Sequence, residues 1–435
     1  MRLRNYAVIS FLINLCCISV YAQDTLRLSR QQCEGIFLKE NLYLLAEKLE
    51  VPMAEAMVLQ AGLWPNPVIA VEDVNLWATQ KQLSVFGEEI PGLGGGNFGR
   101  NLQFAFSVEQ LIETAGKRKK RIALEETGVQ KSIQNFEELL RSLKTEFRHR
   151  LTSLQFLQAS QKIYLRQILS VQQLTLALQK QLDRGFISKG EFVRLKALEM
   201  ELTKNANELE REINKTQTEL KLFMRLPAEK WIFLTDPFKL SAPHQLQPPL
   251  LSILLDSAKT LRPDLKLAGL QQKYFDNLYS YERAQRAPNL TVKGAYDRAS
   301  NFMYNFVGFG VAIDLPIFNK NQGNIKQARI AIDQSKLLYE QKALTVENEI
   351  ALAYQNLLAS IRFYKTIEPG YEQTLEELLD AYTKNFTARN LSLLEYLDFI
   401  DAYLENKKII LEAEKNVMEK AEELNFSVGR EIIKS

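Results

Sequence analysis

Three carboxylate residues follow one another at three-residue steps near the end of the chain: Glu395, Asp398 and Asp401. On a helix this spacing places them on one face, where grouped carboxylates attract cations. A solvated helix face has the same spacing. Glu395 also has a second explanation, because Ser392 precedes it by three residues and the pair predicts a capping box at a helix start.

No other arrangement of residues points to catalysis or to a bound cofactor. The two histidines, His149 and His244, are far apart in the sequence, and neither has a cysteine or carboxylate at metal-ligand spacing. The glycine-rich segment 92–96 follows no clear buried strand, opens no helix and lacks the lysine of a phosphate-binding loop. We therefore predict no enzyme, no metal site and no cofactor.

The first 22 residues have the pattern of a secretory signal peptide. Arg2 and Arg4 precede an apolar run, and Val20-Tyr21-Ala22 fits a cleavage site. Lipidation at Cys16 is left open. Without the two arginines the chain has 53 basic and 52 acidic residues, a balance that does not predict binding to nucleic acid.

Cleavage would leave Cys33 as the last cysteine, so the exported chain would have no internal disulfide. We expect Cys33 to be a small buried hydrophobic residue on the first helix. This helix is predicted to begin at a capping box of Ser29 and Gln32 and to run up to Leu63. No later run reaches the ~18 apolar residues that a membrane helix requires. A chain of this composition would enter a membrane only as a β-barrel.

Two segments have the period-two alternation of β-strands. Apolar residues alternate with polar or small ones around Leu102–Val108, and the same pattern returns in a hairpin predicted from Leu290 to Leu315. Proline residues precede or follow these strands, where a missing ladder donor is tolerated. A soluble sheet with one wet face gives this pattern, and so does an outer-membrane strand of ~9–11 residues.

Long helices are predicted after each pair of strands. Between Lys117 and Arg184 the chain has no proline, and an unbroken helix of this length would measure roughly 100 Å. Its apolar residues recur at steps of three and four, as in a coiled-coil seam. Ser188 with Glu191, like Ser392 with Glu395, predicts a capping box where the chain turns back. In the second turn we expect Asn390 near the place that Gly185 takes in the first, because asparagine tolerates a left-handed backbone. Pro369-Gly370 predicts a break in the second long helix.

The same plan occurs twice along the chain. Pro65-Asn66 is repeated 223 positions later as Pro288-Asn289, at the predicted change from helix to strand. After the signal peptide 1–22, we predict a first repeat at 23–225, a non-helical linker at 226–250 and a second repeat at 251–435. The first repeat has a β-hairpin at about 66–111 and a helical tip at 184–190; the second has a β-hairpin at about 288–316 and a tip at 387–392.

Several short motifs occur in one order along nearly the whole mature chain. They are Gln60-Ala61-Gly62-Leu63-Trp64-Pro65-Asn66-Pro67, Gly116-Lys117-Arg118, Arg262-Pro263-Asp264-Leu265, Ala287-Pro288-Asn289-Leu290, Leu315-Pro316-Ile317-Phe318-Asn319-Lys320-Asn321-Gln322-Gly323 and Asn390-Leu391-Ser392-Leu393-Leu394-Glu395-Tyr396-Leu397-Asp398. With them the chain resembles the TolC-like outer-membrane efflux proteins, or outer membrane factors, and among these the CzcC-type subgroup associated with heavy-metal efflux.

The resemblance implies a mixed, mainly α fold and a homotrimer. Each protomer would give four strands to an outer-membrane β-barrel and long coiled-coil hairpins to an α-helical periplasmic barrel, in two internal repeats. The implied partners are a periplasmic adaptor, an inner-membrane pump of the RND type and outer-membrane lipid. The implied location is the outer membrane of a Gram-negative bacterium, with a periplasmic tunnel.

The resemblance also implies two sets of functional residues. Acidic residues after the second tip would form rings facing the lumen in a trimer and would act in its gate: Glu395, Asp398 and Asp401. Residues of the two tips would contact the adaptor: Arg184, Gly185, Phe186 and Ser188 in the first, and Arg389, Asn390, Leu391 and Ser392 in the second. The alternative role of both tips is to reverse the chain.

The function predicted from the sequence is a passive exit duct of a tripartite efflux system, carrying metal cations or other small molecules. A periplasmic coiled-coil adaptor or structural protein is the alternative, since it would share the long hairpins. An adaptor has one such hairpin and does not need two sets of alternating strands. The sequence does not identify the cargo.

Overall fold

The computed structural model describes residues 25–77, 98–240, 247–299 and 304–433. The predicted signal peptide, the glycine-rich segment 92–96 and His244 lie outside these residues. Contacts divide the chain into two compact units. One unit comprises Met1–Ala46, Glu138–Arg262 and Val346–Ser435, and the other comprises Glu47–Glu137 and Pro263–Thr345.

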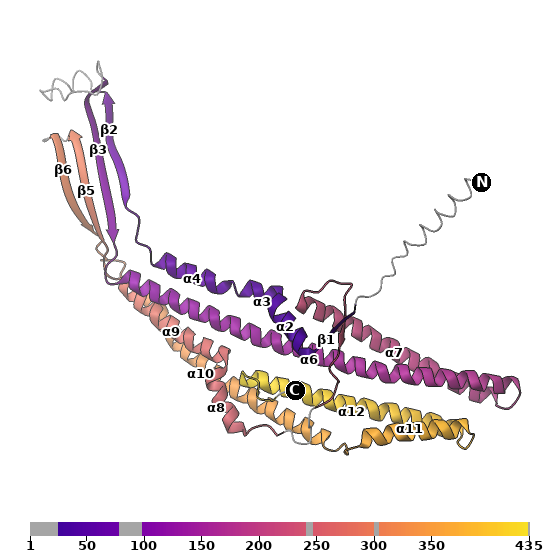
Figure 1. The fold of residues 1–435 in the computed structure, drawn as a ribbon. Coiled ribbons are helices and arrows are strands. Elements are labelled where there is room, and N and C mark those ends of the chain that lie inside the picture. Colours follow the sequence, from indigo (N-terminus) through magenta and orange to yellow (C-terminus); the bar gives the residue numbers. More distant parts are fainter. Residues whose placement is uncertain (1–24, 78–97, 241–246, 300–303, 434–435) are drawn as a thin grey trace, which may run out of the picture. The chain divides into compact units, whose positions relative to one another are not determined.

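A four-stranded antiparallel sheet lies in the second of these units (Figure 1). Its strands are β2 (Val68–Trp77), β3 (Phe98–Ile112), β5 (Leu290–Ala299) and β6 (Tyr304–Ile313), in the order β2-β3-β5-β6. The alternating runs predicted to be strands lie in β3 and β6. β6 ends at Ile313, two residues before the predicted end at Leu315.

The two faces of this sheet differ in polarity. One face carries rows of apolar side chains across all four strands, for example Val71, Phe106, Tyr296 and Val307, which are paired in register. On the opposite face, Lys293 Nζ lies 2.9 Å from Glu109 Oε1. The side chains of the apolar face are exposed on β6, where Phe309 is 89% exposed.

The motifs at the ends of the strands bind one another in the same unit. Lys117, at the start of α6 (Lys117–Asp183), donates from Nζ to the Ala287 carbonyl at 2.8 Å and to Asn289 Oδ1 at 2.5 Å. Arg118 donates to the Gly62 carbonyl at 2.6 Å and lies over the Trp64 ring. The contacts explain the spacing of these motifs, because they hold the points where helix becomes strand.

Three further helical segments belong wholly or partly to this unit. They are α4 (Glu50–Ala61), α9 (Pro263–Ala284) and the first part of α10 (Gln322–Tyr364). Asn277 on α9 donates to Thr127 on α6 at 2.8 Å, and Lys131 on α6 lies over the Tyr274 ring at 4.5 Å. These polar contacts hold α9 against α6.

The start of the mature chain corrects the prediction of one helix up to Leu63. The structure has α2 (Arg30–Glu40), α3 (Leu42–Glu47) and α4 in its place. Asn41 causes the first break, because its backbone is extended and its side chain accepts from the Leu44 amide at 2.9 Å. The predicted capping box of Ser29 and Gln32 is present at the start of α2. Cys33 is buried, as predicted.

The predicted linker 226–250 contains a strand that the sequence did not reveal. β1 (Thr25–Leu28) pairs in parallel with β4 (Trp231–Leu234). Both strands have four residues, which is too short for a period to be recognised. The pair fastens the linker to the beginning of the described chain.

The remaining helices of the first unit form two antiparallel hairpins, visible in Figure 1. One is made by α6 and α7 (Lys189–Met224), the other by α11 (Tyr371–Thr387) and α12 (Leu393–Val428). The break predicted at Pro369-Gly370 is confirmed, since α10 ends at Tyr364 and Gly370 has a φ of 86°. A short helix, α8 (Leu251–Leu261), packs on α12.

Among the described residues, the core of this unit includes two apolar clusters. One joins α6, α7, α11 and α12 through side chains such as Val171, Leu198, Leu375 and Ile400. The other joins α8, α10 and the second half of α12. Among the described residues, no helix combines the length and the apolarity needed to cross a membrane.

Candidate functional site

The candidate site lies at the two helical tips, whose backbones turn in the same way. Phe186 N donates to the Gln181 carbonyl and Asn390 N donates to the Asn385 carbonyl, both at 2.9 Å. Such a bond across five residues closes a helix end when the residue before the donor is left-handed. That residue is Gly185 in the first tip, with a φ of 77°.

In the second tip the left-handed residue is Arg389, with a φ of 65°. This corrects the prediction that Asn390 takes the place of Gly185. Ser188 and Ser392 are 204 positions apart, and the same offset relates Gly185 to Arg389. An arginine in this conformation is strained by about 1–2 kcal/mol. Such strain persists only where the surrounding structure compensates for it, so compensating contacts of the Arg389 side chain are expected.

Both predicted capping boxes start the returning helices. Ser188 accepts from the Glu191 amide at 3.2 Å, and Ser392 accepts from the Glu395 amide at 3.3 Å. The glutamates accept in return from the serine amides, each at 2.9 Å. Hydrogen bonds from Ser392 lower the pKa of Glu395. The carboxylate of Glu395 is therefore occupied locally.

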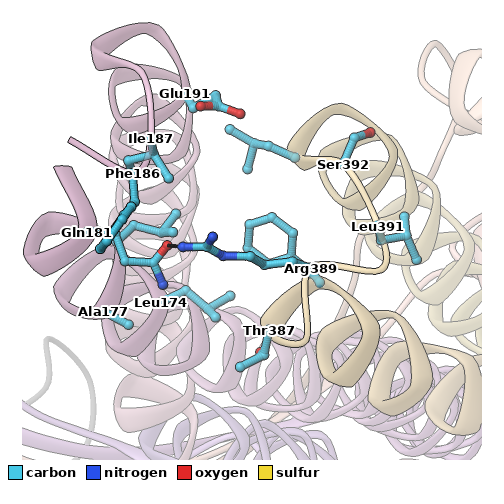
Figure 2. A pocket seen from close by; sticks show the side chains of 13 residues that line it. Leu174, Ala177, Gln181, Phe186, Ile187, Glu191, Thr387, Arg389, Leu391 and Ser392 are labelled. Carbon is cyan, nitrogen blue, oxygen red and sulfur yellow. Dashed lines mark hydrogen bonds between the residues drawn. The ribbon is translucent and has the colours of Figure 1, made fainter. Parts of the chain in front are cut away.

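A cavity of about 250 Å³ lies between the two tips (Figure 2). Arg389 reaches across it, and its Nη2 donates to Gln181 Oε1 at 2.7 Å. The guanidinium also lies 5.9 Å from the centre of the Phe186 ring. The charged side chain thus joins the second tip to the first, which gives the strained residue its role.

The lining of this cavity combines apolar side chains with polar and charged ones. Four of the predicted tip residues line it: Phe186, Arg389, Leu391 and Ser392. The other predicted tip residues, Arg184, Gly185, Ser188 and Asn390, are exposed on the turns outside the lining. The sequence prediction missed the helix residues of the lining, which include Leu174, Leu178, Gln181 and Phe386. Their apolar spacing was visible, but it indicated only a helix seam.

The three predicted gate residues lie on the exposed side of α12. The opposite side of the helix is buried, with Tyr396 and Ile400 in the core. Burial, followed by the charges of Glu201 on α7 and of Asp398, raises the pKa of Asp401. Asp398 and Asp401 thus belong to an acidic surface that includes a residue of the first hairpin.

Within the part of the chain that the structure describes, no three His, Cys, Asp or Glu side chains gather so as to hold a metal ion. The site consists of a tip cavity with one bridging arginine and an adjacent acidic surface on α12. This arrangement can bind or exclude molecules and ions by shape and charge.

Known proteins resemble this chain both in sequence and in fold. The family model "Outer membrane efflux protein" matches residues 254–430. Cobalt-zinc-cadmium resistance protein CzcC of Cupriavidus metallidurans is 30% identical over 121 residues, covering 28% of this chain and 29% of CzcC. Probable outer membrane lipoprotein SilC of Salmonella typhimurium is 26% identical over 233 residues, covering 50% of this chain and 48% of SilC. The chain therefore spans less than half the length of each of these relatives.

Solved structures match over most of the chain. CusC, whose structures concern folding and transmembrane channel formation, has a TM-score of 0.69 at 18% identity, covering 92% of each chain. The open state of the Neisseria gonorrhoeae MtrE outer membrane channel has a TM-score of 0.70 at 16% identity, covering 92% of this chain and 89% of MtrE. These likenesses establish the mainly helical fold of outer-membrane channels. The predicted resemblance to outer-membrane efflux proteins is confirmed.

Proposed function

We propose that this chain, which matches the outer membrane efflux protein family over residues 254–430, is the passive exit duct of a tripartite efflux system. Substrates delivered by an inner-membrane pump of the RND type and a periplasmic adaptor would leave through it. Family members are channels rather than enzymes, and we propose the same for this chain. The observation that carries the proposal is a sheet with rows of apolar residues on one exposed face, in a chain that also forms long helical hairpins.

The sheet supports assembly in lipid. β2 and β6 are edge strands, and unpaired strand edges are not tolerated in a bilayer. Copies of the chain would pair these edges and close a β-barrel, with the apolar face towards lipid and the face of Glu109 and Lys293 towards the lumen. We propose a homotrimer, in which the helical hairpins form the periplasmic tunnel. The alternative, a periplasmic adaptor, does not account for the open apolar face.

Two repeats, 23–225 and 251–435, joined by the linker 226–250, are part of this proposal. The support is the equal hydrogen bonding of the two tips and the paired motifs at the two helix-to-strand junctions. Each repeat gives one β-hairpin and one helical hairpin to the duct.

Substitutions on the two faces of β6 test this proposal. Val311 lies on the apolar face and Ala312 on the other. Val311→Asp would place a charge in lipid, at a cost below the about 2–4 kcal/mol of an arginine or lysine at the bilayer midplane, and we expect it to reduce the amount of protein in the outer-membrane fraction. Ala312→Asp, the matched control, should still be inserted. Equal insertion of both variants would contradict a lipid-facing sheet.

The exposed carboxylates on α12 are proposed as lumen rings of the gate. In a trimer Asp398 and Asp401 would each occur three times around the axis and would attract cations. Glu395 contributes less, because Ser392 binds its carboxylate. Asp398→Asn should reduce the cation selectivity of single channels, whereas Asp380→Asn on α11 should not. Unchanged selectivity in the first variant would exclude the ring.

The two tips are proposed as the adaptor contact. Arg184 is exposed on the first turn, and the cavity beside it is open to an apolar side chain of a partner. Arg184→Glu should weaken cross-linking to the adaptor without reducing the trimer. Arg194→Glu, the same charge change on the exposed surface of α7, serves as the control. Equal cross-linking of both variants would contradict the assignment.

The cargo is proposed to include metal cations, because CzcC is named for resistance to cobalt, zinc and cadmium. Deletion of the chain should then raise the sensitivity of its host to these metals. Unchanged sensitivity would leave the duct proposal standing and direct attention to another cargo.

A further inference from the structure

The second helical hairpin has a break that the first lacks. α10 ends at Tyr364, residues 365–370 form a turn, and α11 begins at Tyr371. Gly370 is left-handed at 86°, and the preceding proline cannot continue a helix. α12 runs unbroken past this point, alongside α11 in Figure 1. The backbone of 365–370 can therefore turn without disturbing a helical hydrogen-bond ladder.

Side chains on both sides of the break are bound to α12. Tyr364 Oη donates to Glu414 Oε1 at 3.3 Å, and Tyr371 Oη donates to Asn406 Oδ1 at 3.0 Å. The end of α10 and the beginning of α11 are thus held at two points about two helical turns apart on α12.

A buried lysine holds the first turns of α11. The side chain of Lys407 is 7% exposed, and its Nζ lies 2.6 Å from Glu372 Oε1 and 3.0 Å from Glu376 Oε1. Glu376 also accepts from Tyr403 at 2.8 Å and pairs with Arg166 of α6 at 2.8 Å. We call Arg166, Glu372, Glu376, Tyr403 and Lys407 the Lys407 cluster. It joins α6, α11 and α12.

The electrostatics of this cluster favour two states, one with α11 bound to Lys407 and one with α11 fully separated from it. A buried ammonium is stable only while its carboxylates are in place, because an uncompensated charge in the interior is costly. Burial opposes ionisation of Glu376, but hydrogen bonds from Tyr403 and Lys407 outweigh it and hold its pKa below the ordinary value. If α11 moves away, both carboxylates leave Lys407 and water must enter. Partial opening is therefore disfavoured.

The protonation state of Glu414 affects the charges of the Lys407 cluster. Its side chain is buried, and this burial raises its pKa to about 7 against the hydrogen bond from Tyr364. The charged groups that act on it are Glu372 of α11, Lys407 of α12 and Lys239 of the segment after β4. When Glu414 ionises, it repels Glu372 and attracts Lys407. Both effects weaken the contact between Lys407 and the beginning of α11.

We propose that residues 365–370 are a hinge for α11, that the Lys407 cluster is the latch of this hinge, and that loss of the proton from Glu414 loosens the latch. At low pH, Glu414 is neutral and the latch is closed. At high pH, Glu414 is charged and α11 separates more often from α12. The hinge does not depend on the proposed function; only its consequence for a duct does.

Amide hydrogen exchange of the purified full-length protein in detergent tests the latch without partner, cargo or channel activity. Between pH 6 and pH 8 the ionised fraction of a group titrating near pH 7 rises about tenfold. After correction for intrinsic exchange rates, we expect exchange of residues 371–380 to rise about tenfold as well. Residues 195–220 of α7 provide the internal control and should not change.

Three variants complete the test. Glu414→Gln should keep exchange of 371–380 low at both pH values, and Lys407→Met should make it high at both. Lys408→Met, at the exposed neighbour of Lys407, should behave as the wild type. Equal exchange of the wild type at pH 6 and pH 8, or a pH response in Glu414→Gln equal to that of the wild type, would overturn the proposal. Because Glu414→Gln keeps the acceptor for Tyr364, this outcome does not depend on whether Lys407→Met folds.

Discussion

The two helical hairpins have the same turns and different stems. Both tips close with the same hydrogen bonds and begin their return with a Ser–Glu capping box. The first hairpin, however, is entered by α6, which runs for 67 residues without a break, whereas the second is entered through a turn at 365–370. With the offset of 204 that relates the tips, Thr203 is the position in the first hairpin that corresponds to Lys407, and Thr203 is exposed. The first stem is therefore continuous, whereas the second combines a break with a charge cluster around the buried Lys407.

The largest effect expected from this difference is the loss of the buried lysine. Lys407→Met leaves Glu372 and Glu376 without their shared cation. We expect the free energy of unfolding to fall by about 3 kcal/mol. This is the lower end of the range for broken buried ion pairs, because the Glu372 side chain reaches solvent. Thr203→Met in the first stem should change stability by less than about 0.5 kcal/mol. Thermal unfolding of both variants measures this. Similar losses would remove the distinction between the stems.

The second prediction concerns pH. Glu414 has a folded pKa of about 7, above its ordinary value of 4.5, so its stabilising contribution is full below pH 4.5 and is lost as the pH rises to 7. Glu414→Gln removes this loss. Its stability relative to the wild type should grow by about 2–3 kcal/mol between pH 5 and pH 8. Unfolding curves of the two proteins at both pH values would show this, and parallel curves would contradict a titrating Glu414.

The third prediction compares the left-handed residues of the tips. Gly185→Ala should destabilise the first turn by about 1–2 kcal/mol, since no neighbouring atom lies within 4 Å and only the backbone is strained. Arg389→Gly should be more stable than Arg389→Ala by the same amount, because both lose the bond to Gln181. If the glycine–alanine differences in the two turns disagree in sign, the turns are not equivalent.

The smallest effect expected is at the capping serines. Ser188→Ala and Ser392→Ala should each cost about 1 kcal/mol, as the loss of an N-cap does elsewhere. Equal costs in denaturant unfolding would support equivalent turns. A clearly larger cost at Ser392 would mean that the broken stem depends more on its tip.

Local patterns in the sequence were sufficient for the turns and the stems. Ser188 and Ser392 predicted their capping boxes, Pro369-Gly370 predicted the break, and alternation predicted β3 and β6. These signals lie within a few residues, and the forces that produce them are equally local. The error at Asn390 has a physical reason: the left-handed residue is fixed by the register of the turn, and Arg389 accepts the strain because it bonds to Gln181.

Contacts between distant segments could not be predicted in this way. β1 and β4 are 206 positions apart in register, from Thr25 to Trp231, and neither has a recognisable period. The lining of the tip cavity comes from two hairpins. The role of Gln181 as acceptor for Arg389 could therefore be recognised only once the two hairpins were seen together. Lys407 looked like any helix lysine, because its burial depends on Glu372 and Glu376 of another helix. The acidic run at 395–401 was visible, but the role that we propose for it requires other copies of the chain.

The central claim is that the open apolar sheet is closed by other copies in the outer membrane. Electrophoresis of detergent-extracted outer membranes, with and without heating, tests it most directly. We predict that the unheated protein migrates as a complex of three chains and that heating converts it to single chains. A soluble monomer recovered from the periplasm, with none in the outer-membrane fraction, would contradict the account.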